Sequence, residues 1–420
     1  MLACAAAGCR RHASPAPAPQ GNLGAPVARA TPSDAADASA AAPPRGTQIV
    51  LAYQSNLLAE LEQCGCPVHP TGGLARRATM LDRARGQADA VLVLDAGDLL
   101  LAAVPPTATA TAGAGQTPPD AGEVTRRAHL MLAALARMGV AAFTPGERDL
   151  ALGPALLRRL LDEHRIPAVS ANLYDRAGQR LFDADRLIDV AGVRIGVFGL
   201  TRAAPADAAL WAGWRVEARD PIAAARAEVA SLRARGAAVV VALVHAGAYA
   251  DAQAILRAAP GIDWAVLGHS GMNFEMPDEV GTARALEAMT GGRDFGRLDL
   301  HVVGGDARRF ADRGQRAQLL TILEDHQRQI GELREHAERQ PPILQARTAE
   351  RIARLEKAID SDRALLAAQP AQIRGSWFEN RIVPLDAEIP DHPAVAALVD
   401  AYNHESQRRD AHVKPTNSRP

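Results

Sequence analysis

Short apolar runs that alternate with helical patterns constrain the fold of this chain more than any other feature of its sequence. The apolar runs are bounded by Gly, Pro and polar residues and lie at Thr47–Tyr53, Ala90–Leu94, Val140–Phe143, Ala168–Ala171, Val193–Leu200, Ala238–Val244 and Trp264–Leu267. Helical patterns between them lie at Leu74–Arg85, Val124–Met138 and Ala223–Arg235. This alternation predicts an α/β domain whose sheet is covered on both faces. A hairpin pattern at Leu187–Leu200, with its turn at Ala191-Gly192, predicts that the sheet is mixed.

The composition of the chain excludes several classes of protein. Its 420 residues carry a formal net charge of −1, so no overall positive field recruits nucleic acid, and we predict no nucleic-acid partner. No stretch approaches the roughly 20 uninterrupted apolar residues of a membrane-spanning helix. Charged residues make up 23% of the chain and hydrophobic residues 48%, a balance that excludes a fibrous or a wholly disordered protein.

Composition also predicts four parts along the chain. Residues 1–46 are rich in Ala, Pro and Ser and form a leader and linker, whereas residues 47–310 hold the strand–helix alternation. Residues 311–370 contain two long, charged helical patterns separated by Pro341-Pro342, which predicts an αα-hairpin. We favour a hairpin that braces the domain, and a dimerising coiled coil is the alternative. Residues 371–420 form a C-terminal segment and tail.

The leader contains Ala6-Ala7-Gly8-Cys9, which has the form of a bacterial lipoprotein cleavage site. We expect cleavage before Cys9, a lipid anchor on its thiol, and a location at the cell envelope, as a periplasm-facing lipoprotein or in the periplasm. Only eight residues precede Cys9, and they include neither a basic segment nor the long apolar segment of a signal peptide. Two explanations are open: the start codon is placed too far downstream, or the motif at Cys9 matches by chance.

Two further cysteines lie close together in Cys64-Gly65-Cys66. A disulfide between them would close a very short, strained ring. We therefore predict two inert thiols in a loop. The alternative is a pair of thiolates that serve a metal or a redox function near the functional site.

Polar side chains stand where four of the predicted strands end. These side chains are Asp98, Glu147, His245 and His269. Because ligands of open α/β sheets bind beyond the carboxyl ends of the strands, we expect the four side chains to lie together. Two carboxylates and two imidazoles are a suitable ligand set for Zn²⁺, Mn²⁺ or Fe. For His245 taken alone, a hydrogen-bonded structural histidine is the commoner role.

Several short motifs follow one another in an order that is known from one protein family. They are Gly72-Gly73-Leu74-Ala75-Arg76-Arg77, Leu94-Asp95-Ala96-Gly97-Asp98, Thr144-Pro145-Gly146, Ser170-Ala171-Asn172, Gly196-Val197-Phe198-Gly199-Leu200-Thr201, Val244-His245-Ala246-Gly247, and Gly261-Ile262-Asp263 leading to Gly268-His269-Ser270. From about Thr47 to about Gly304 the chain resembles the N-terminal domain of the periplasmic 5'-nucleotidase family, within the calcineurin-like metallophosphoesterases. The resemblance implies an α/β fold of metallophosphoesterase-like mixed β sheets flanked by helices, followed here by the C-terminal helical hairpin. It also implies a site in which two metal ions act on a phosphate ester.

The same resemblance implies that the ligands of the first metal are lost. The family's Asp-x-His motif falls on Asn56-Leu57-Leu58, where Asn56 is a poor substitute and Leu58 cannot bind a metal. The second His of the family's Gly-His-x-His motif falls on Gly271. A dinuclear site of the family's kind is therefore degenerate in this chain.

The resemblance also implies that this chain keeps the ligands of the second metal. Asp98, His245 and His269 match ligands of the family, and Glu147 stands where the family has a ligand Asn. We predict a mononuclear site of these four residues that holds one divalent ion, Zn, Mn or Fe, and the extra negative charge of Glu147 favours a lone cation. The alternative is that the four residues remain for folding and bind no metal.

The residues after Glu147 are the candidates for catalysis. Arg148 stands where the resemblance places the family's catalytic His. In a one-metal reaction, Arg148 would support the phosphoryl oxygens, and Asp149 would orient Arg148 or act as a base. Equally, Arg148 would pair with Glu147 or Asp149 and fill the vacated space.

Two classes of function follow from these residues. The first is an exported 5'-nucleotidase-like hydrolase that acts on a small phosphorylated substrate with a single metal. The second is a non-catalytic pseudo-phosphoesterase that binds an unidentified ligand or partner at the cell envelope. The segment after residue 310 is too short and too poor in aromatic residues for the family's nucleoside-binding domain, so we do not carry nucleotide specificity over.

Overall fold

The structure is a computed structural model that describes residues 46–64, 70–104, 121–202, 208–304, 309–337, 341–368, 373 and 375–413. Cys9 with its predicted lipid anchor, and Cys66, lie outside these residues. Among the described residues, no helix combines the length and the apolar character that crossing a membrane requires.

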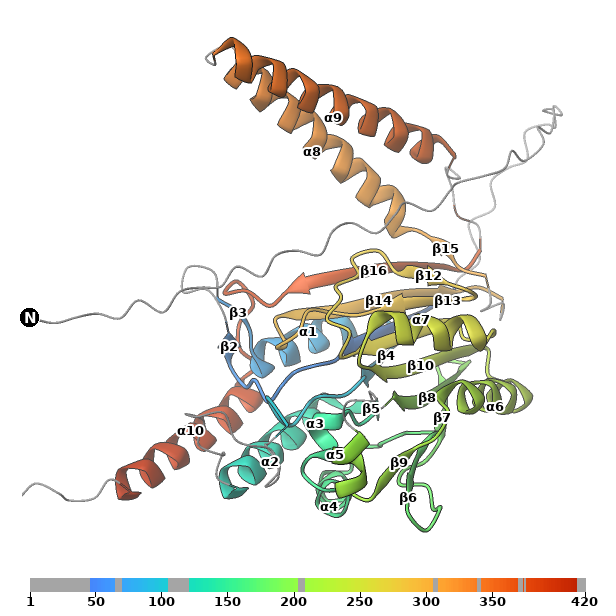
Figure 1. Cartoon of the computed structure of the whole chain (residues 1–420), viewed down its shortest axis with the longest axis vertical. Coiled ribbons are helices and arrows are strands. Elements are labelled where there is room, and N and C mark those ends of the chain that lie inside the picture. The colour runs from blue at the N-terminus through green and yellow to red at the C-terminus, as the bar shows by residue number, and fades with distance from the viewer. Residues whose placement is uncertain are drawn as a thin grey trace, which may run out of the picture. The chain divides into compact units, whose positions relative to one another are not determined.

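Two six-stranded sheets organise the domain (Figure 1). The first has the order β15-β16-β14-β1-β4-β5, with β1 (Thr47–Gln54), β4 (Ala90–Asp95), β5 (Val140–Phe143), β14 (Asp294–Val302), β15 (Ala311–Asp312) and β16 (Trp377–Pro384). The second has the order β12-β13-β11-β10-β8-β7, with β7 (Asp185–Val190), β8 (Val193–Arg202), β10 (Val239–Ala246), β11 (Trp264–Gly268), β12 (Asp278–Val280) and β13 (Ala283–Leu286). Smaller sheets pair β2 (Gln63–Cys64) with β3 (Thr71–Gly72), and β6 (Leu173–Asp175) with β9 (Val216–Ala218).

Both sheets are mixed, as predicted. In the first sheet β1, β4 and β5 are parallel, whereas β14 is antiparallel to β1 and to β16. In the second sheet β8, β10, β11 and β13 are parallel, and the predicted hairpin is confirmed as the antiparallel pair of β7 and β8. Its turn falls at Ala191 and Gly192, which both have positive φ angles, 47° and 83°. Such angles match the twist of a two-residue hairpin.

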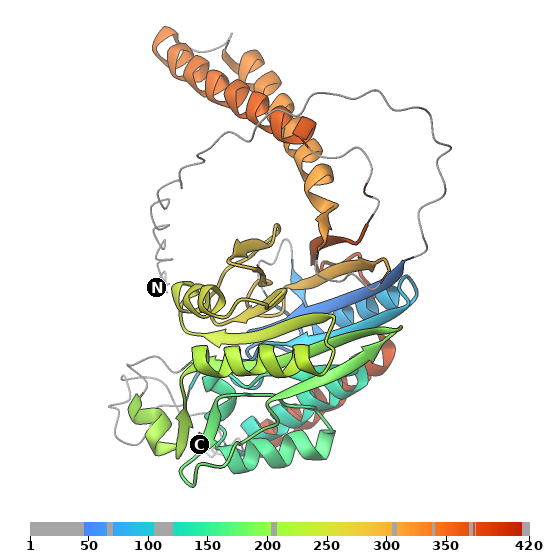
Figure 2. The same ribbon diagram turned by 90° about the vertical axis from the view of Figure 1, so that its right-hand side faces the viewer.

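The domain has four layers, because each sheet is covered by the other sheet on one face and by helices on the opposite face (Figure 2). Strand β1 shows the alternation that this arrangement requires: Ile49 and Leu51 belong to the core between the sheets, and Val50 and Ala52 to the core beneath the helices. Helices α1 (Leu74–Arg85), α2 (Ala121–Met138), α4 (Pro154–His164) and α10 (Pro393–Val413) cover the first sheet. Helices α6 (Pro221–Ala234) and α7 (Tyr249–Ala258) cover the second.

The predicted strand over Ala168–Ala171 is wrong. The backbone there makes only isolated bridges, from Ala168 to Phe143 and from Val169 to Asp183. The N–H group of Ala171 then donates to the carbonyl of Gly199 in the second sheet, 2.8 Å away. The run is apolar because it crosses the buried space between the two sheets, and not because it pairs along one of them.

The C-terminal part of the fold is a helical hairpin followed by a return to the first sheet. Helices α8 (Gly314–Ala337) and α9 (Pro342–Ala368) pack on one another through a small apolar cluster that includes Leu323, Ile330 and Ile359. The predicted α/β fold with a C-terminal helical hairpin is thus confirmed. After the hairpin, β16 pairs with β14, and α10 packs against α1 and α2.

Candidate metal centre

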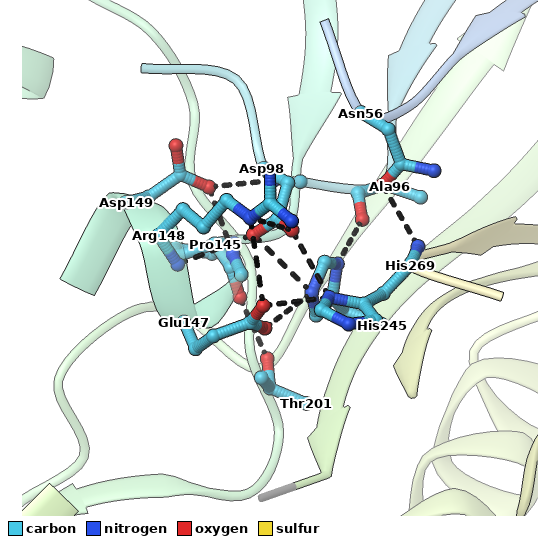
Figure 3. A network of polar contacts seen from close by, with 12 residues as sticks. Asn56, Ala96, Asp98, Pro145, Glu147, Arg148, Asp149, Thr201, His245 and His269 are labelled. Atoms are coloured by element: carbon cyan, nitrogen blue, oxygen red, sulfur yellow. Dashed lines mark hydrogen bonds and ion pairs between the residues drawn. The ribbon is translucent and has the colours of Figure 1, made fainter. Parts of the chain in front are cut away.

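Four side chains from the two sheets converge at the carboxyl ends of parallel strands (Figure 3). Asp98 follows β4, and Glu147 begins the short helix α3 (Glu147–Leu150) beyond β5. His245 lies near the end of β10, and His269 directly follows β11. We call Asp98, Glu147, His245 and His269 the four-residue cluster. The structure thus brings together all four of the residues predicted as metal ligands.

Each imidazole of the cluster faces both carboxylates. His245 Nε2 lies 2.7 Å from Glu147 Oε2 and 3.4 Å from Asp98 Oδ1. His269 Nδ1 lies 2.6 Å from Glu147 Oε1 and 3.1 Å from Asp98 Oδ2. One ligating atom from each residue lies within 4.8 Å of all the others. The four atoms therefore enclose a position of the size that one cation needs.

The cluster is closed on one side and open on the other. The side chains of His245 and Asp98 are 0% and 1% exposed, whereas that of His269 is 30% exposed. His245 Nδ1 donates to the carbonyl oxygen of Ala96 at 2.8 Å, which fixes the ring and leaves Nε2 facing the carboxylates. This arrangement of a held imidazole beside two carboxylates fits a divalent ion such as Zn²⁺, Mn²⁺ or Fe²⁺.

The charges of the cluster are strongly coupled. Hydrogen bonds to Asp98 and Glu147 raise the pKa of His269 to about 10. Burial acts to lower the pKa of His245, but the Asp98 and Glu147 carboxylates outweigh it and raise that pKa to about 9. Burial likewise acts to raise the pKa of Glu147, yet the two imidazoles hold it far below its usual range. Two protons on the imidazoles thus balance two carboxylates, and one divalent cation would carry the same charge.

Glycines allow the backbone to approach His245 closely. A Cβ atom on Gly146 would lie 2.5 Å from His245 Cε1 and 2.3 Å from Asp98 Oδ1. A Cβ atom on Gly268 would lie 2.8 Å from His245 Nδ1 and 2.2 Å from the carbonyl oxygen of Ala96. These glycines are needed because any side chain would displace a ligand of the cluster.

Arg148 is held against Asp98. Its Nε lies 3.2 Å from Asp98 Oδ2, and its Nη1 donates to the carbonyl oxygen of Ala102 at 2.7 Å. The backbone N–H of Arg148 also donates to Asp98 Oδ1 at 3.2 Å. The guanidinium therefore places a positive charge beside the cluster, on a side chain that is 25% exposed.

Asp149 is surrounded by backbone donors. Its Oδ1 accepts the N–H groups of Leu99 and Leu100 at 2.9 and 2.8 Å, and its Oδ2 accepts those of Asp98 and Gly146, both at 2.9 Å. Burial raises the pKa of Asp149 to about 7, and the backbone donors limit that rise because they favour the ionised carboxylate. Since both oxygens are occupied, the expected roles of Asp149 as a base or as the partner of Arg148 do not match the arrangement. We propose that Asp149 positions Asp98.

Comparisons with known proteins agree with this fold. No protein-family model matches the chain. Over 241 residues the chain is 27% identical to a 5'-nucleotidase of Vibrio cholerae, a match that covers 56% of this chain and 36% of the relative. It is also 27% identical over 228 residues to a 2',3'-cyclic-nucleotide 2'-phosphodiesterase/3'-nucleotidase of Yersinia enterocolitica, covering 49% of this chain and 33% of the relative. Over about half of its length the chain is thus similar in sequence to bacterial nucleotidases.

A solved structure extends the comparison to the fold. The calcineurin-like phosphoesterase YfkN from Bacillus subtilis superposes with a TM-score of 0.56 at 14% identity, covering 87% of this chain and 99% of that one. By contrast, this chain spans only about a third of the length of the two curated relatives. The sequence likeness is therefore confined to part of each relative.

Two of the positions that the family resemblance assigns to a first metal, Asn56 and Gly271, belong to one hydrogen-bond network. Asn56 Oδ1 accepts the backbone N–H of His269 at 2.8 Å, and Asn56 Nδ2 donates to Glu287 Oε1 at 3.2 Å. Glu287 also accepts the Ser270 hydroxyl and, at 3.0 Å, the N–H of Gly271. The network holds the loop that carries His269, whose φ of 69° is unusual for a residue other than Gly.

Sequence reasoning missed Glu287, although a signal was present. Glu287 stands between apolar residues directly after β13, where an ionisable side chain has no structural reason to occur. It is fully buried, and burial raises its pKa to about 7. An isolated acidic residue at the end of an apolar strand is thus the pattern that would have found it.

We expect Glu287→Gln to change the pH dependence of stability. A carboxyl group whose pKa rises from 4.5 to about 7 on folding stabilises the protein fully below pH 4.5, and this stability is lost as the pH rises to 7. The loss reaches about 3 kcal/mol at 1.36 kcal/mol per pKa unit. Gln keeps the acceptor for Asn56 and Gly271 and does not titrate. In chelator-treated protein, the free energy of unfolding of the variant relative to wild type should therefore be higher at pH 8 than at pH 5. An equal difference at both pH values would show that Glu287 keeps its ordinary pKa.

Proposed function

We propose that this chain is an exported metallophosphoesterase-fold hydrolase that acts on small phosphate esters with a single divalent metal ion. The observation that supports it most strongly is the convergence of Asp98, Glu147, His245 and His269, with all four ligating atoms within 4.8 Å of one another. The hydrogen-bond network around Glu287 supports the single-metal form, because it engages Asn56 and Gly271, two positions at which the resemblance places ligands of a first metal.

The four-residue cluster would hold the ion, and Arg148 would act beside it. A divalent ion bound there supplies Lewis acidity toward a phosphoryl group. The guanidinium of Arg148, 25% exposed and next to Asp98, is placed to donate hydrogen bonds to phosphoryl oxygens. The exposed edge of His269 is the side from which a substrate would approach.

A location at the cell envelope belongs to the same proposal. It rests on the lipoprotein-like sequence at Cys9 and on the Ala/Pro-rich linker that follows it. A lipid on the Cys9 thiol would hold the domain at the membrane surface through that linker.

A non-catalytic protein is the second candidate, and one observation favours it. Arg148 already donates to the Ala102 carbonyl and pairs with Asp98, which is how a side chain that only fills a vacated position would behave. In that case the cluster would bind a metal or a ligand without turnover.

Hydrolysis of an aryl phosphate separates the two candidates. The full chain, supplied with Mn²⁺, Zn²⁺ or Fe²⁺, should hydrolyse p-nitrophenyl phosphate, and a chelator should stop the reaction. His269→Ala should abolish the activity, because His269 faces both carboxylates, whereas His336→Ala on the exposed face of α8 should keep it. Activity that survives in His269→Ala would place the reaction elsewhere, and a chain that binds metal but shows no hydrolysis would support the non-catalytic candidate.

A further inference from the structure

Two histidines and a glutamate meet on the surface of the first helical layer. His129 lies on α2, and Glu163 and His164 form the C-terminal end of α4. His129 Nδ1 lies 3.0 Å from His164 Nε2 and 3.9 Å from Glu163 Oε1. One ligating atom from each lies within 4.8 Å of the other two. We call these three residues the α2–α4 triad; it shares no residue with the four-residue cluster.

The two imidazoles face one another through ring nitrogens, which either an N–H···N hydrogen bond or a metal ion can join. The rings meet at 64°, with centroids 5.3 Å apart, so that an edge nitrogen of one faces an edge nitrogen of the other. A neutral imidazole has one N–H and one lone pair, so two facing nitrogens are compatible only if a proton or a metal ion lies between them. The carboxylate of Glu163 beside the pair adds negative charge, which favours a cation at that position.

We propose that His129, Glu163 and His164 form a second metal site, which takes a divalent transition-metal ion of the Zn²⁺ class and links α2 to α4. Two imidazoles and a carboxylate are a common ligand set for Zn²⁺. Zn–N bonds of about 2.0–2.1 Å at a tetrahedral angle place the two nitrogens about 3.4 Å apart. The observed separation of 3.0 Å is close to that value. The exposed Glu163 side chain reaches the ion by a small change of rotamer.

The helices hold the triad in place without the ion. Fully buried side chains of both helices, among them Leu132, Leu157 and Leu160, belong to the same apolar core. His164 is the last residue of α4, where the partial negative charge of the helix end favours a cation. Because the backbone is already ordered, binding of the ion costs only the ordering of three side chains. The expected role is a cross-link between two helices that lie over the first sheet.

Zinc titration of the untagged, chelator-treated full chain tests this site. His129→Gln and His164→Gln should each bind one equivalent of Zn²⁺ less than wild type. Because both histidines serve the same ion, the double variant should also bind only one equivalent less than wild type. If residual binding is measurable, its affinity should fall on the order of a hundredfold. His336→Gln is the matched control, because it removes an exposed histidine of α8 and should leave the stoichiometry unchanged.

The result is independent of the four-residue cluster. The measured quantity is a difference of one equivalent of Zn²⁺ between variant and wild type, whatever the four-residue cluster binds. Because the two histidines lie on different helices, one misfolded variant does not decide the outcome. Glu163→Gln, at an exposed position, should weaken the same equivalent on the order of tenfold. Equal zinc stoichiometry and affinity in wild type, His129→Gln and His164→Gln would overturn the site and leave a hydrogen bond between two histidines.

Discussion

His245→Ala should lower the metal content of the purified full chain by one equivalent. His245 is completely buried, its Nε2 faces both carboxylates of the four-residue cluster, and its Nδ1 is fixed by the carbonyl of Ala96. A buried ligand of this kind is not replaced by solvent, so we expect the ion to be lost entirely. Elemental analysis of protein purified without chelator, and then dialysed against Mn²⁺, measures the difference.

Glu147→Gln gives a milder change at the same centre. It keeps the size of the side chain and removes its charge, which each imidazole contacts within 2.7 Å. We expect the affinity for Mn²⁺ to fall on the order of a hundredfold. His404→Ala, on an exposed position of α10, is the matched control and should bind metal as wild type does.

An unchanged metal content in His245→Ala would remove this residue from the site, and a loss of two equivalents would mean that His245 serves two ions.

The parallel strands could be predicted because strands that are buried on both faces have continuous apolar sequences. Strand β10 is buried at every position and reads as a continuous apolar run, and β11 and most of β8 do the same. The helices over these strands show helical spacing, and α1 has the predicted bounds Leu74–Arg85. The alternation along the first part of the chain was therefore sufficient to identify the α/β class.

The later strands could not be predicted, because their polar residues are satisfied only in the folded sheet. Arg297 and Asp299 lie two residues apart in β14 and form a paired contact, with Nε–Oδ2 and Nη2–Oδ1 distances of 2.9 and 2.8 Å. Arg381 of β16 joins them at 2.8 Å from Asp299 Oδ2. In the sequence these residues resemble a charged loop. The pairing of β14 with β16 spans the whole helical hairpin, so no local pattern indicates it.

The residues of the candidate metal centre also divide into those that the sequence could predict and those that it could not. Asp98, His245 and His269 could be predicted because ligands gather at the ends of parallel strands, and that rule needs only the strand positions. The part played by Asp149 could not be predicted, since it depends on the backbone of residues about fifty positions away. Glu287 was missed for a similar reason: its partners Asn56 and Gly271 approach only when both sheets are packed.

Asp149→Asn should lower the stability of the folded chain. The carboxylate accepts four buried backbone N–H groups, two on each oxygen. The amide of Asn has one acceptor oxygen, so its NH₂ group must face two N–H donors that lose their partner. At about 1–3 kcal/mol for each of two unsatisfied buried donors, the free energy of unfolding should fall by about 2–6 kcal/mol. Removal of a buried charge whose pKa is raised to about 7 offsets part of this loss. Urea unfolding at pH 8, where the carboxylate is ionised, measures this loss.

The same change should also lower the affinity of the four-residue cluster for a metal ion, because Asp149 holds the strained backbone of Asp98. Asp98 has a φ of 57°, in the left-handed region, and its N–H is one of the four that Asp149 accepts. When that clamp is lost, the Asp98 carboxylate is no longer fixed between His245 and His269. The exposed Asp162→Asn on α4 is the matched control and should change the stability by less than about 0.5 kcal/mol. If Asp149→Asn unfolds at the same urea concentration as wild type, the four N–H groups have other acceptors, and Asp149 does not position Asp98.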